Sequence, residues 1–283
     1  MPDNPIKQMA ATPALKVGHF LVEFATPGIG HILKTAGCEF VILDTEHSGF
    51  SYETVRNVAQ YTRAADLPLV VRVPSKEYHH IARAADMGAE AIMLPMVGSA
   101  EEARHILNCM KYPPTGGRGA IFQFAHDDYL PGAPLDKMKA ANRKTALFAQ
   151  IETAEGVANV DEIAAVDGVD VLWVGHFDLS NSLGIPGQFD HPDFLAATDA
   201  VTKACKKYGK SAGRLVPTVE ESIKLYKDGF DFISYSGDVW AFLGAISSAV
   251  NAIRQGCSTL SKRRESAAKK SAKANAASGK KKK

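Results

Sequence analysis

Eight short apolar runs separated by amphipathic stretches constrain the fold of this 283-residue chain more than any other feature. The runs are typical of buried β-strands and cover His19–Phe24, Phe40–Leu43, Leu69–Val73, Ala91–Leu94, Ala146–Ile151, Val169–Val174, Ser211–Leu215 and Phe232–Tyr235. Helical patterns cover Tyr52–Ala65, Tyr78–Met87, Ala100–Met110, Ala158–Ala165, Phe194–Tyr208, Val219–Lys227 and Val239–Arg254. Glycines stand at expected helix C-caps: Gly37, Gly88, Gly168, Gly209 and Gly229. We therefore predict an α/β fold, a (β/α)8 TIM barrel.

Charge and composition divide the chain into three parts. We predict an N-terminal extension over residues 1–14, the barrel over 15–256, and a disordered Lys/Ala-rich basic tail over 257–283. From Lys262 onward there are ten Lys or Arg and one acid, so this segment carries +9 and leaves −7 on the remainder of a chain whose net charge is +2. The segment shows no apolar periodicity, and such tails are usually solvated.

Other features limit the class of protein. The four cysteines are scattered without metal-ligand spacing and are expected to be reduced thiols. No apolar stretch is long enough for a membrane span, and the N-terminus lacks the layout of a secretory signal, so we expect a cytoplasmic protein. Basic tails are weak motifs, so we do not expect a nucleic-acid partner.

Two carboxylates follow consecutive predicted strands. Glu152 ends the fifth apolar run, and Asp178 lies just past the sixth. Acids are costly in such surroundings unless a cation or proton compensates them, and in a barrel both would lie at the carboxy-terminal mouth. Their oxygen atoms suit a hard divalent ion such as Mg²⁺ or Mn²⁺. Both acids also stand where helix N-caps are found, so capping remains the alternative.

Further polar residues fall at the same predicted mouth. Asp44 and His47 follow the second strand, and an imidazole is a common general acid–base group. Arg72 closes the third strand, where a charge implies a bound anion or an ion pair with Asp44 or Asp86. Gln150 and Leu215 end strands five and seven.

The segment from Lys111 to Leu135 is rich in Pro and Gly and shows no clear element. Because it comes after the fourth strand, we expect it over the barrel mouth, either as a functional loop or as a plain excursion. Its Gly116-Gly117-Arg118-Gly119 lacks the Lys-Ser/Thr of a phosphate-binding loop. No strand-end Lys suggests Schiff-base chemistry.

The strand-end segments together resemble one family. They are Ile42-Leu-Asp44-Thr-Glu46-His47, Val70-Val-Arg72-Val-Pro74, Leu94-Pro-Met-Val97, Tyr112-Pro-Pro-Thr-Gly-Gly-Arg118-Gly119, Gln150-Ile-Glu152-Thr153 and Gly175-His-Phe-Asp178-Leu-Ser180. In this order they resemble the HpcH/HpaI aldolases, metal-dependent class II pyruvate aldolases that include 4-hydroxy-2-oxoheptanedioate aldolase and 2-keto-3-deoxy sugar acid aldolases. The resemblance covers about residues 15 to 255.

The resemblance implies a barrel of the phosphoenolpyruvate/pyruvate-domain type and a lyase that cleaves or forms 4-hydroxy-2-oxo acids through a metal-bound pyruvate enolate. It implies that Glu152 and Asp178 hold Mg²⁺, Mn²⁺ or Co²⁺ and that Arg72 contacts the keto oxygen. His47 would assist proton transfer, supported by Asp44. It further implies that Gln150 lies beside the metal ligands, that the amides of Phe177 and Asp178 bind the pyruvate carboxylate, and that Leu215 lines the substrate site.

The resemblance also implies a homo-oligomer, a hexamer or trimer, with the last barrel helix exchanged between copies. Two residues depart from the family pattern. His176 stands where the family usually has Pro, and could be a further ligand, an electrostatic modulator or simply tolerated; Arg214 could bind an acidic aldehyde or point outward. Other reactions at the same site are open, namely oxaloacetate decarboxylation or citrate-lyase-like cleavage of an acyl-CoA, for which Lys76 and Arg118 would be the only nearby cations. A scaffold barrel that acts through its tail is the non-enzymatic alternative.

Overall fold

The computed structural model describes residues 5–279, and it contains the barrel that the sequence predicts. Eight parallel strands close in sequence order, with β1 hydrogen-bonded to both β2 and β8. The strands are β1 (Lys16–Leu21), β2 (Phe40–Asp44), β3 (Leu69–Arg72), β4 (Ala91–Leu94), β5 (Ala146–Ile151), β6 (Val169–Val174), β7 (Ser211–Val216) and β8 (Phe232–Gly237). The fold prediction is confirmed.

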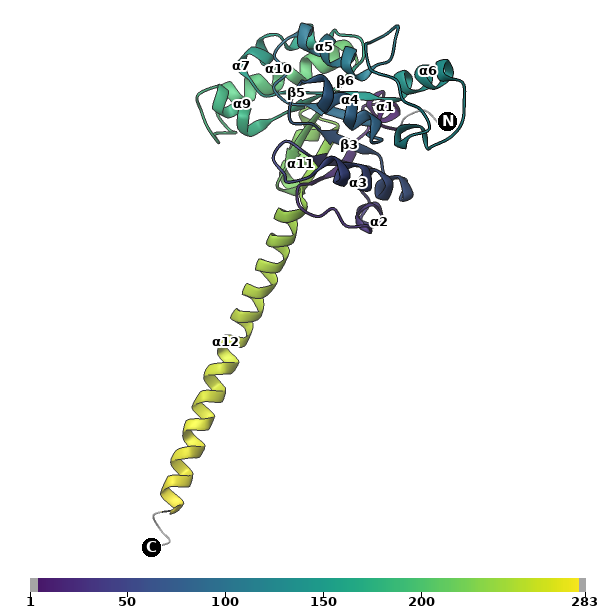
Figure 1. Ribbon diagram of the computed structural model, residues 1–283. Helices are drawn as coiled ribbons and strands as arrows, with labels where there is room; N and C mark the ends of the chain where they lie inside the picture. Colours follow the sequence, from purple (N-terminus) through teal and green to yellow (C-terminus); the bar gives the residue numbers. More distant parts are fainter. Residues whose placement is uncertain (1–4, 280–283) are drawn as a thin grey trace. The chain divides into compact units, whose positions relative to one another are not determined.

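Helices connect and surround the strands. They are α1 (Pro5–Ala10), α2 (Ile29–Thr35), α3 (Tyr52–Ala64), α4 (Tyr78–Asp86), α5 (Ala100–Met110), α6 (Pro134–Lys144), α7 (Ala154–Ala158), α8 (Val160–Ala164), α9 (His176–Ser182), α10 (Pro192–Tyr208), α11 (Val219–Lys227) and α12 (Asp238–Gly279), with a 3₁₀ turn η1 (Ala125–Asp127). Figure 1 shows helices such as α3, α4 and α5 around the strands. The five glycines predicted at helix ends all have positive φ, which fits left-handed C-caps.

The barrel interior is filled by aromatic and aliphatic side chains. Phe40, Phe148 and Phe232 pack there with Trp173, and the rings of Phe148 and Phe232 meet edge to face with centroids 5.4 Å apart. Trp173 fits because residue 213 is a glycine, since a Cβ at Gly213 would lie 2.2 Å from the indole ring. Apolar residues of α1 belong to the same cluster, so the predicted N-terminal extension contributes a helix to the core.

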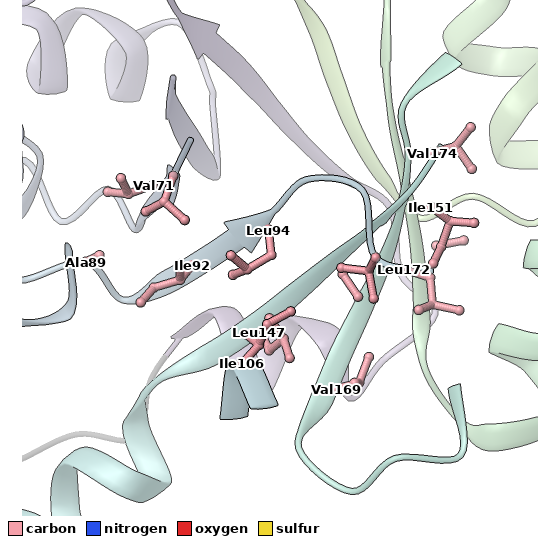
Figure 2. Packing of buried hydrophobic residues seen from close by; sticks show 14 of the residues in the cluster. Val71, Ala89, Ile92, Leu94, Ile106, Leu147, Ile151, Val169, Leu172 and Val174 are labelled. Atoms are coloured by element: carbon pink, nitrogen blue, oxygen red, sulfur yellow. The ribbon is translucent and has the colours of Figure 1, made fainter. Parts of the chain in front are cut away.

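A second apolar layer lies between the strands and the outer helices. Figure 2 shows part of it, where Ile92 of β4, Leu147 of β5 and Leu172 of β6 lie in the same cluster as Ile106 of α5. Since both faces of each strand are covered, the strands carry continuous apolar runs rather than alternating ones. This is why the runs could be recognised in the sequence.

Two sequence-based placements are wrong. The first strand begins at Lys16, three residues before the predicted start, and Lys16 is buried beside Asp231, with Nζ 2.7 Å from Oδ2. The segment 111–135 does not cover the barrel mouth; its described contacts are with outer helices, through Arg118 to Asp86 of α4 and Ala125 to Arg63 of α3. The reason is that the segment follows α5, which has already carried the chain back toward the amino-terminal end. The helices α1, α2, α6 and α9 lie outside the helical stretches predicted from the sequence, and α7 overlaps them by one residue.

The chain divides after Asp238 into two units, and the second consists of the described part of α12. The predicted barrel extends to residue 256, and the predicted disordered tail begins at 257. The structure differs, because α12 continues as a helix through this segment to Gly279. Ala, Lys, Arg and Glu are strong helix formers and fill the sequence there. Residues 280–283 of the tail lie outside the described part, and the domain boundaries stay predictions.

Candidate active site

The carboxy-terminal ends of the strands bring the predicted polar residues to one rim of the barrel. Asp44 and Arg72 are the last residues of β2 and β3, and the strand register pairs them directly. Glu152 follows β5, and Asp178 lies in the first turn of α9, after β6. Parallel strands of a closed barrel end at the same face, which is where barrel enzymes have their active sites.

Arg72 is held in a fixed orientation by two acids. Its Nε and Nη2 donate to the two carboxylate oxygens of Asp44 at 2.8 and 2.7 Å, and its Nη1 lies 3.2 Å from Glu46 Oε2. Burial lowers the pKa of Arg72, but the hydrogen bonds to Asp44 and the nearby negative charges outweigh it, so the net shift is upward. Of the two ion pairs left open by the sequence, Asp44 is the partner, while Asp86 pairs with Arg118.

His47 lies at the same rim with its side chain largely exposed, at 64% of its reference area. Its closest acid is Glu46, with Nε2 3.7 Å from Oε2. The hydrogen bonds of Asp44 go to Arg72 and to the Glu46 amide, and among the described residues none joins Asp44 to His47. Glu46 is therefore a residue that the sequence analysis did not assign, although it belongs to the same motif.

Glu152 is deeply buried, with 2% of its surface exposed. The Met96 amide donates to its Oε1 at 2.6 Å, and the Gln150 side-chain amide donates to its Oε2. Burial raises the pKa of Glu152 to about 7; these two hydrogen bonds oppose the rise, and the charges of Glu46 and Asp178 add to it. An acid in this state is stabilised in its ionised form by a cation.

The hydrogen bonds also show that neither Glu152 nor Asp178 caps the helix that follows it. Helix α7 is capped by Thr153, whose side chain accepts from the Gly156 amide, and not by Glu152. Helix α9 begins after Gly175 without a side-chain cap, and Asp178 lies exposed in its first turn. Both carboxylates are thus available for another role.

The glycine that precedes α9 lets the two segments approach each other. A Cβ on Gly175 would lie 2.1 Å from Glu152 Oε2 and 3.0 Å from the Gln150 amide nitrogen. Real Cβ atoms do not make such contacts, so Glu152 can occupy this position only because residue 175 has no side chain.

The oxygen atoms of the site form a donor set for a divalent cation. Within residues 5–279 no cluster of three His, Cys, Asp or Glu side chains is arranged around a common point, so the protein would supply two carboxylates. One further buried oxygen beside Glu152, Gln150 Oε1, makes no hydrogen bond in the described structure, whereas Glu46 Oε2 is ion-paired with Arg72. Oxygen donors of this kind, with water or substrate completing the shell, suit a hard divalent ion rather than Zn²⁺. The residues fit such an ion.

The remaining candidates take different positions. Leu215 packs against the interior cluster, and the Phe177 side chain is exposed on α9. Arg214 points outward instead, where it is buried and its Nη2 lies 3.0 Å from Glu221 Oε1 on α11. This position does not suit binding of an acidic aldehyde at the mouth.

His176 belongs to the same outer layer. Its ring lies 4.6 Å from that of Phe177 and 5.1 Å from that of Phe189, measured between centroids. Burial, with a smaller effect of Arg214, lowers the pKa of His176 to about 3. No hydrogen bond or ion pair joins it to Glu152 or Asp178 in the part of the chain that the structure describes, so nothing in this geometry supports a further ligand.

A closed (β/α)8 barrel with two carboxylates and a clamped arginine at its carboxy-terminal rim has the arrangement of a barrel enzyme, and comparison with known proteins identifies the family. The profile of the HpcH/HpaI aldolase/citrate lyase family matches residues 18–245. The chain belongs to this family and is an enzyme of the aldolase type. The family and the activity class predicted from the sequence are thereby confirmed.

Individual relatives agree with this assignment. A hydroxypyruvate/pyruvate aldolase of Roseovarius nubinhibens is 32% identical over 239 residues, covering 84% of this chain and 92% of the relative. A 5-keto-4-deoxy-D-glucarate aldolase of Klebsiella pneumoniae is 30% identical over 252 residues, covering 89% and 97%. The crystal structure of an HpcH/HpaI aldolase from Desulfitobacterium hafniense superimposes with a TM-score of 0.81 at 31% identity, covering 86% and 93%.

Proposed function

We propose that this enzyme cleaves or forms 4-hydroxy-2-oxo acids, with pyruvate and an aldehyde as the other reaction partners, and that it requires Mg²⁺, Mn²⁺ or Co²⁺. The observation that carries the proposal is Glu152, a buried acid that caps no helix and whose pKa, raised to about 7, is influenced by the charge of a second carboxylate at the same rim, Asp178. A divalent cation held by these two carboxylates would polarise the ketone of the 2-oxo acid as a Lewis acid.

The side chains around the two acids would divide the remaining work. Arg72, fixed by Asp44, would face the keto oxygen and stabilise the negative charge that develops there. His47 Nε2 would take up the proton of the 4-hydroxyl group through water during cleavage and would supply it to that oxygen in the reverse direction, with Glu46 as its neighbouring acid. Asp44 would support His47 only indirectly, through Glu46, because the hydrogen bonds of the Asp44 side chain are to Arg72 and the Glu46 amide.

Other residues would bind and orient the substrate. Gln150 holds one oxygen of Glu152. The Phe177 and Asp178 amides lie in the first turn of α9, where backbone N–H groups lack helical acceptors, and they would bind the pyruvate carboxylate. Leu215 would line the side of the barrel on which the aldehyde enters.

The chemistry of an acyl-CoA lyase finds less support. Lys76 and Arg118, the cations suggested for a CoA phosphate, are both paired, with Glu102 and Asp86 respectively.

The described residues include no helix with the length and hydropathy of a membrane span. We further propose a cytoplasmic homo-oligomer, a hexamer or trimer. The exposed apolar side chains of α12, among them Trp240, Phe242 and Leu243, support helix exchange.

The test is release of pyruvate from a panel of 4-hydroxy-2-oxo acids and from oxaloacetate, with and without each metal. The wild type is compared with Glu152→Ala and with Glu155→Ala, a matched control because Glu155 is exposed on α7, next to the same strand end. We expect metal-dependent turnover in the wild type and in Glu155→Ala, and loss in Glu152→Ala. Turnover without metal, or full activity of Glu152→Ala, would overturn the mechanism, and activity on oxaloacetate alone would identify a decarboxylase.

A further inference from the structure

The turn after β4 contains a backbone conformation that a methionine rarely adopts. Met96 has φ of 55°, in the left-handed region, although it is neither Gly nor Asn. Such residues persist only where surrounding contacts hold them, and they concentrate at functional sites. In this case the neighbouring contacts can be named on both sides of the residue.

On its amino side, Met96 holds the proposed metal ligand. Its N–H donates to Glu152 Oε1 at 2.6 Å, and the next residue, Val97, donates from its own amide to the Gln150 carbonyl at 3.1 Å. The turn is thereby joined to the end of β5 at the residues that form the site. The left-handed conformation of Met96 sets the direction of its N–H, which contacts Glu152, relative to its carbonyl in the following peptide.

On its carboxyl side, Met96 is held by a lysine from another loop. Lys76 Nζ donates to the Met96 carbonyl at 2.9 Å and forms an ion pair with Glu102. Glu102 in turn accepts from the Gly98 amide at 2.7 Å, so the lysine and its acid both fasten the same turn. The side chain of Lys76 is 29% exposed and does not itself reach Glu152.

We propose that Lys76 is a positioning residue that sets the affinity of the Glu152 site for a divalent cation. It does so by holding the residue Met96 in its left-handed conformation. Without this hydrogen bond, Met96 relaxes toward an ordinary conformation and its N–H leaves Glu152 Oε1. The proposal rests on the proposed function of Glu152 as a metal ligand. Partners that orient a ligand typically change metal affinity by about 10- to 100-fold, and we expect about tenfold here because Gln150 still holds the other oxygen.

The chain offers a matched control for this contact. Lys34 Nζ donates to the Asp66 carbonyl at 2.9 Å, and Asp66 also has a left-handed φ, of 50°. This pair joins the end of α2 to the turn before β3, at the amino-terminal face of the barrel. Lys34→Met therefore removes the same kind of interaction without touching the site.

The experiment measures Mn²⁺ binding to the full-length protein by titration calorimetry, with the Mn²⁺ paramagnetic resonance spectrum as a second readout. We expect Lys76→Met to weaken binding about tenfold and to change the spectrum, and Lys76→Arg, which keeps a donor and the charge, to restore most of the affinity. Lys34→Met should bind as the wild type does. In the double variant Lys76→Met with Met96→Gly, glycine adopts the left-handed conformation without help, so affinity should recover relative to Lys76→Met.

Three results would overturn the inference. Wild-type affinity in a folded Lys76→Met protein would show that the lysine does not act on the site. An equal loss in Lys34→Met would show a general effect of removing a lysine. Absence of any Glu152-dependent Mn²⁺ binding in the wild type would overturn the proposed metal site itself, a failure that the first two results do not imply.

Discussion

Substituting Gly175 by alanine should weaken metal binding while leaving the barrel folded. The new Cβ would lie 2.1 Å from Glu152 Oε2 and 2.8 Å from Glu152 Cβ. Contacts below about 3 Å do not persist, so the carboxylate must move by about 1 Å. The backbone of Gly175, with φ of −83°, does not itself require glycine, so the effect comes from this contact.

The expected loss of Mn²⁺ affinity follows from how small a displacement a metal ligand tolerates. Ligands must be held within about 0.5 Å of their productive positions, and a shift of about 1 Å exceeds this. Because the moved carboxylate would also lose its Met96 or Gln150 hydrogen bond, we expect Mn²⁺ affinity to fall about 10- to 100-fold. This corresponds to about 1.4 to 2.7 kcal/mol of binding free energy.

Titration calorimetry with Mn²⁺ measures the loss, and thermal denaturation without metal confirms that the variant folds. Gly28→Ala is the control, since Gly28 also precedes a helix with φ of −82° but its Cβ would meet only Ile32, at 3.7 Å. We expect Gly28→Ala to bind Mn²⁺ as the wild type does. If folded Gly175→Ala bound Mn²⁺ with wild-type affinity, the position of Glu152 seen here would not be the one that binds metal.

Further predictions concern pH, the barrel base and the tail. With the pKa of Glu152 at about 7, Mn²⁺ affinity should fall about tenfold from pH 8 to pH 6, and calorimetry showing a constant affinity would contradict this. Since that pKa is raised above its unfolded value, the metal-free protein should lose stability as pH rises toward and through 7, and thermal denaturation should show that Mn²⁺ reverses the loss at pH 8. Asp231→Ala leaves buried Lys16 without its acid and should cost about 3–5 kcal/mol in chemical denaturation, with unchanged Mn²⁺ affinity of the folded protein. Removing residues from Lys262 onward should leave kcat/KM unchanged, whereas a scaffold protein would lose its function.

The helices and strands could be predicted as far as burial leaves a pattern in the sequence. The bounds of β4, β5 and β6 are those predicted, because strands covered on both faces consist mostly of apolar residues. The start of β1 could not be predicted, because Lys16 is a polar residue whose burial depends on Asp231, which lies far away in the sequence. The short, largely exposed α6 also lacks a strong apolar pattern, and none of its residues is buried.

For the site, the sequence determined which residues stand at strand ends, and therefore that Asp44, Arg72, Glu152 and Asp178 share one rim. Only the tertiary structure decided their partners. Asp44 binds Arg72 rather than His47, and Glu46 stands beside the imidazole.

Side-chain direction was likewise decided by the tertiary structure. Arg214 follows a residue that faces the interior and therefore points to the outer helices, which a strand-end position alone does not reveal. The left-handed turn at Met96 has no sequence signal at all, because it exists through contacts with Lys76 and Glu152 from other segments. The sequence by itself thus determined the barrel and the composition of its rim, since the apolar pattern and the order of the elements can be followed along the chain. Which groups meet at the rim depended on distant segments brought together by closure of the sheet.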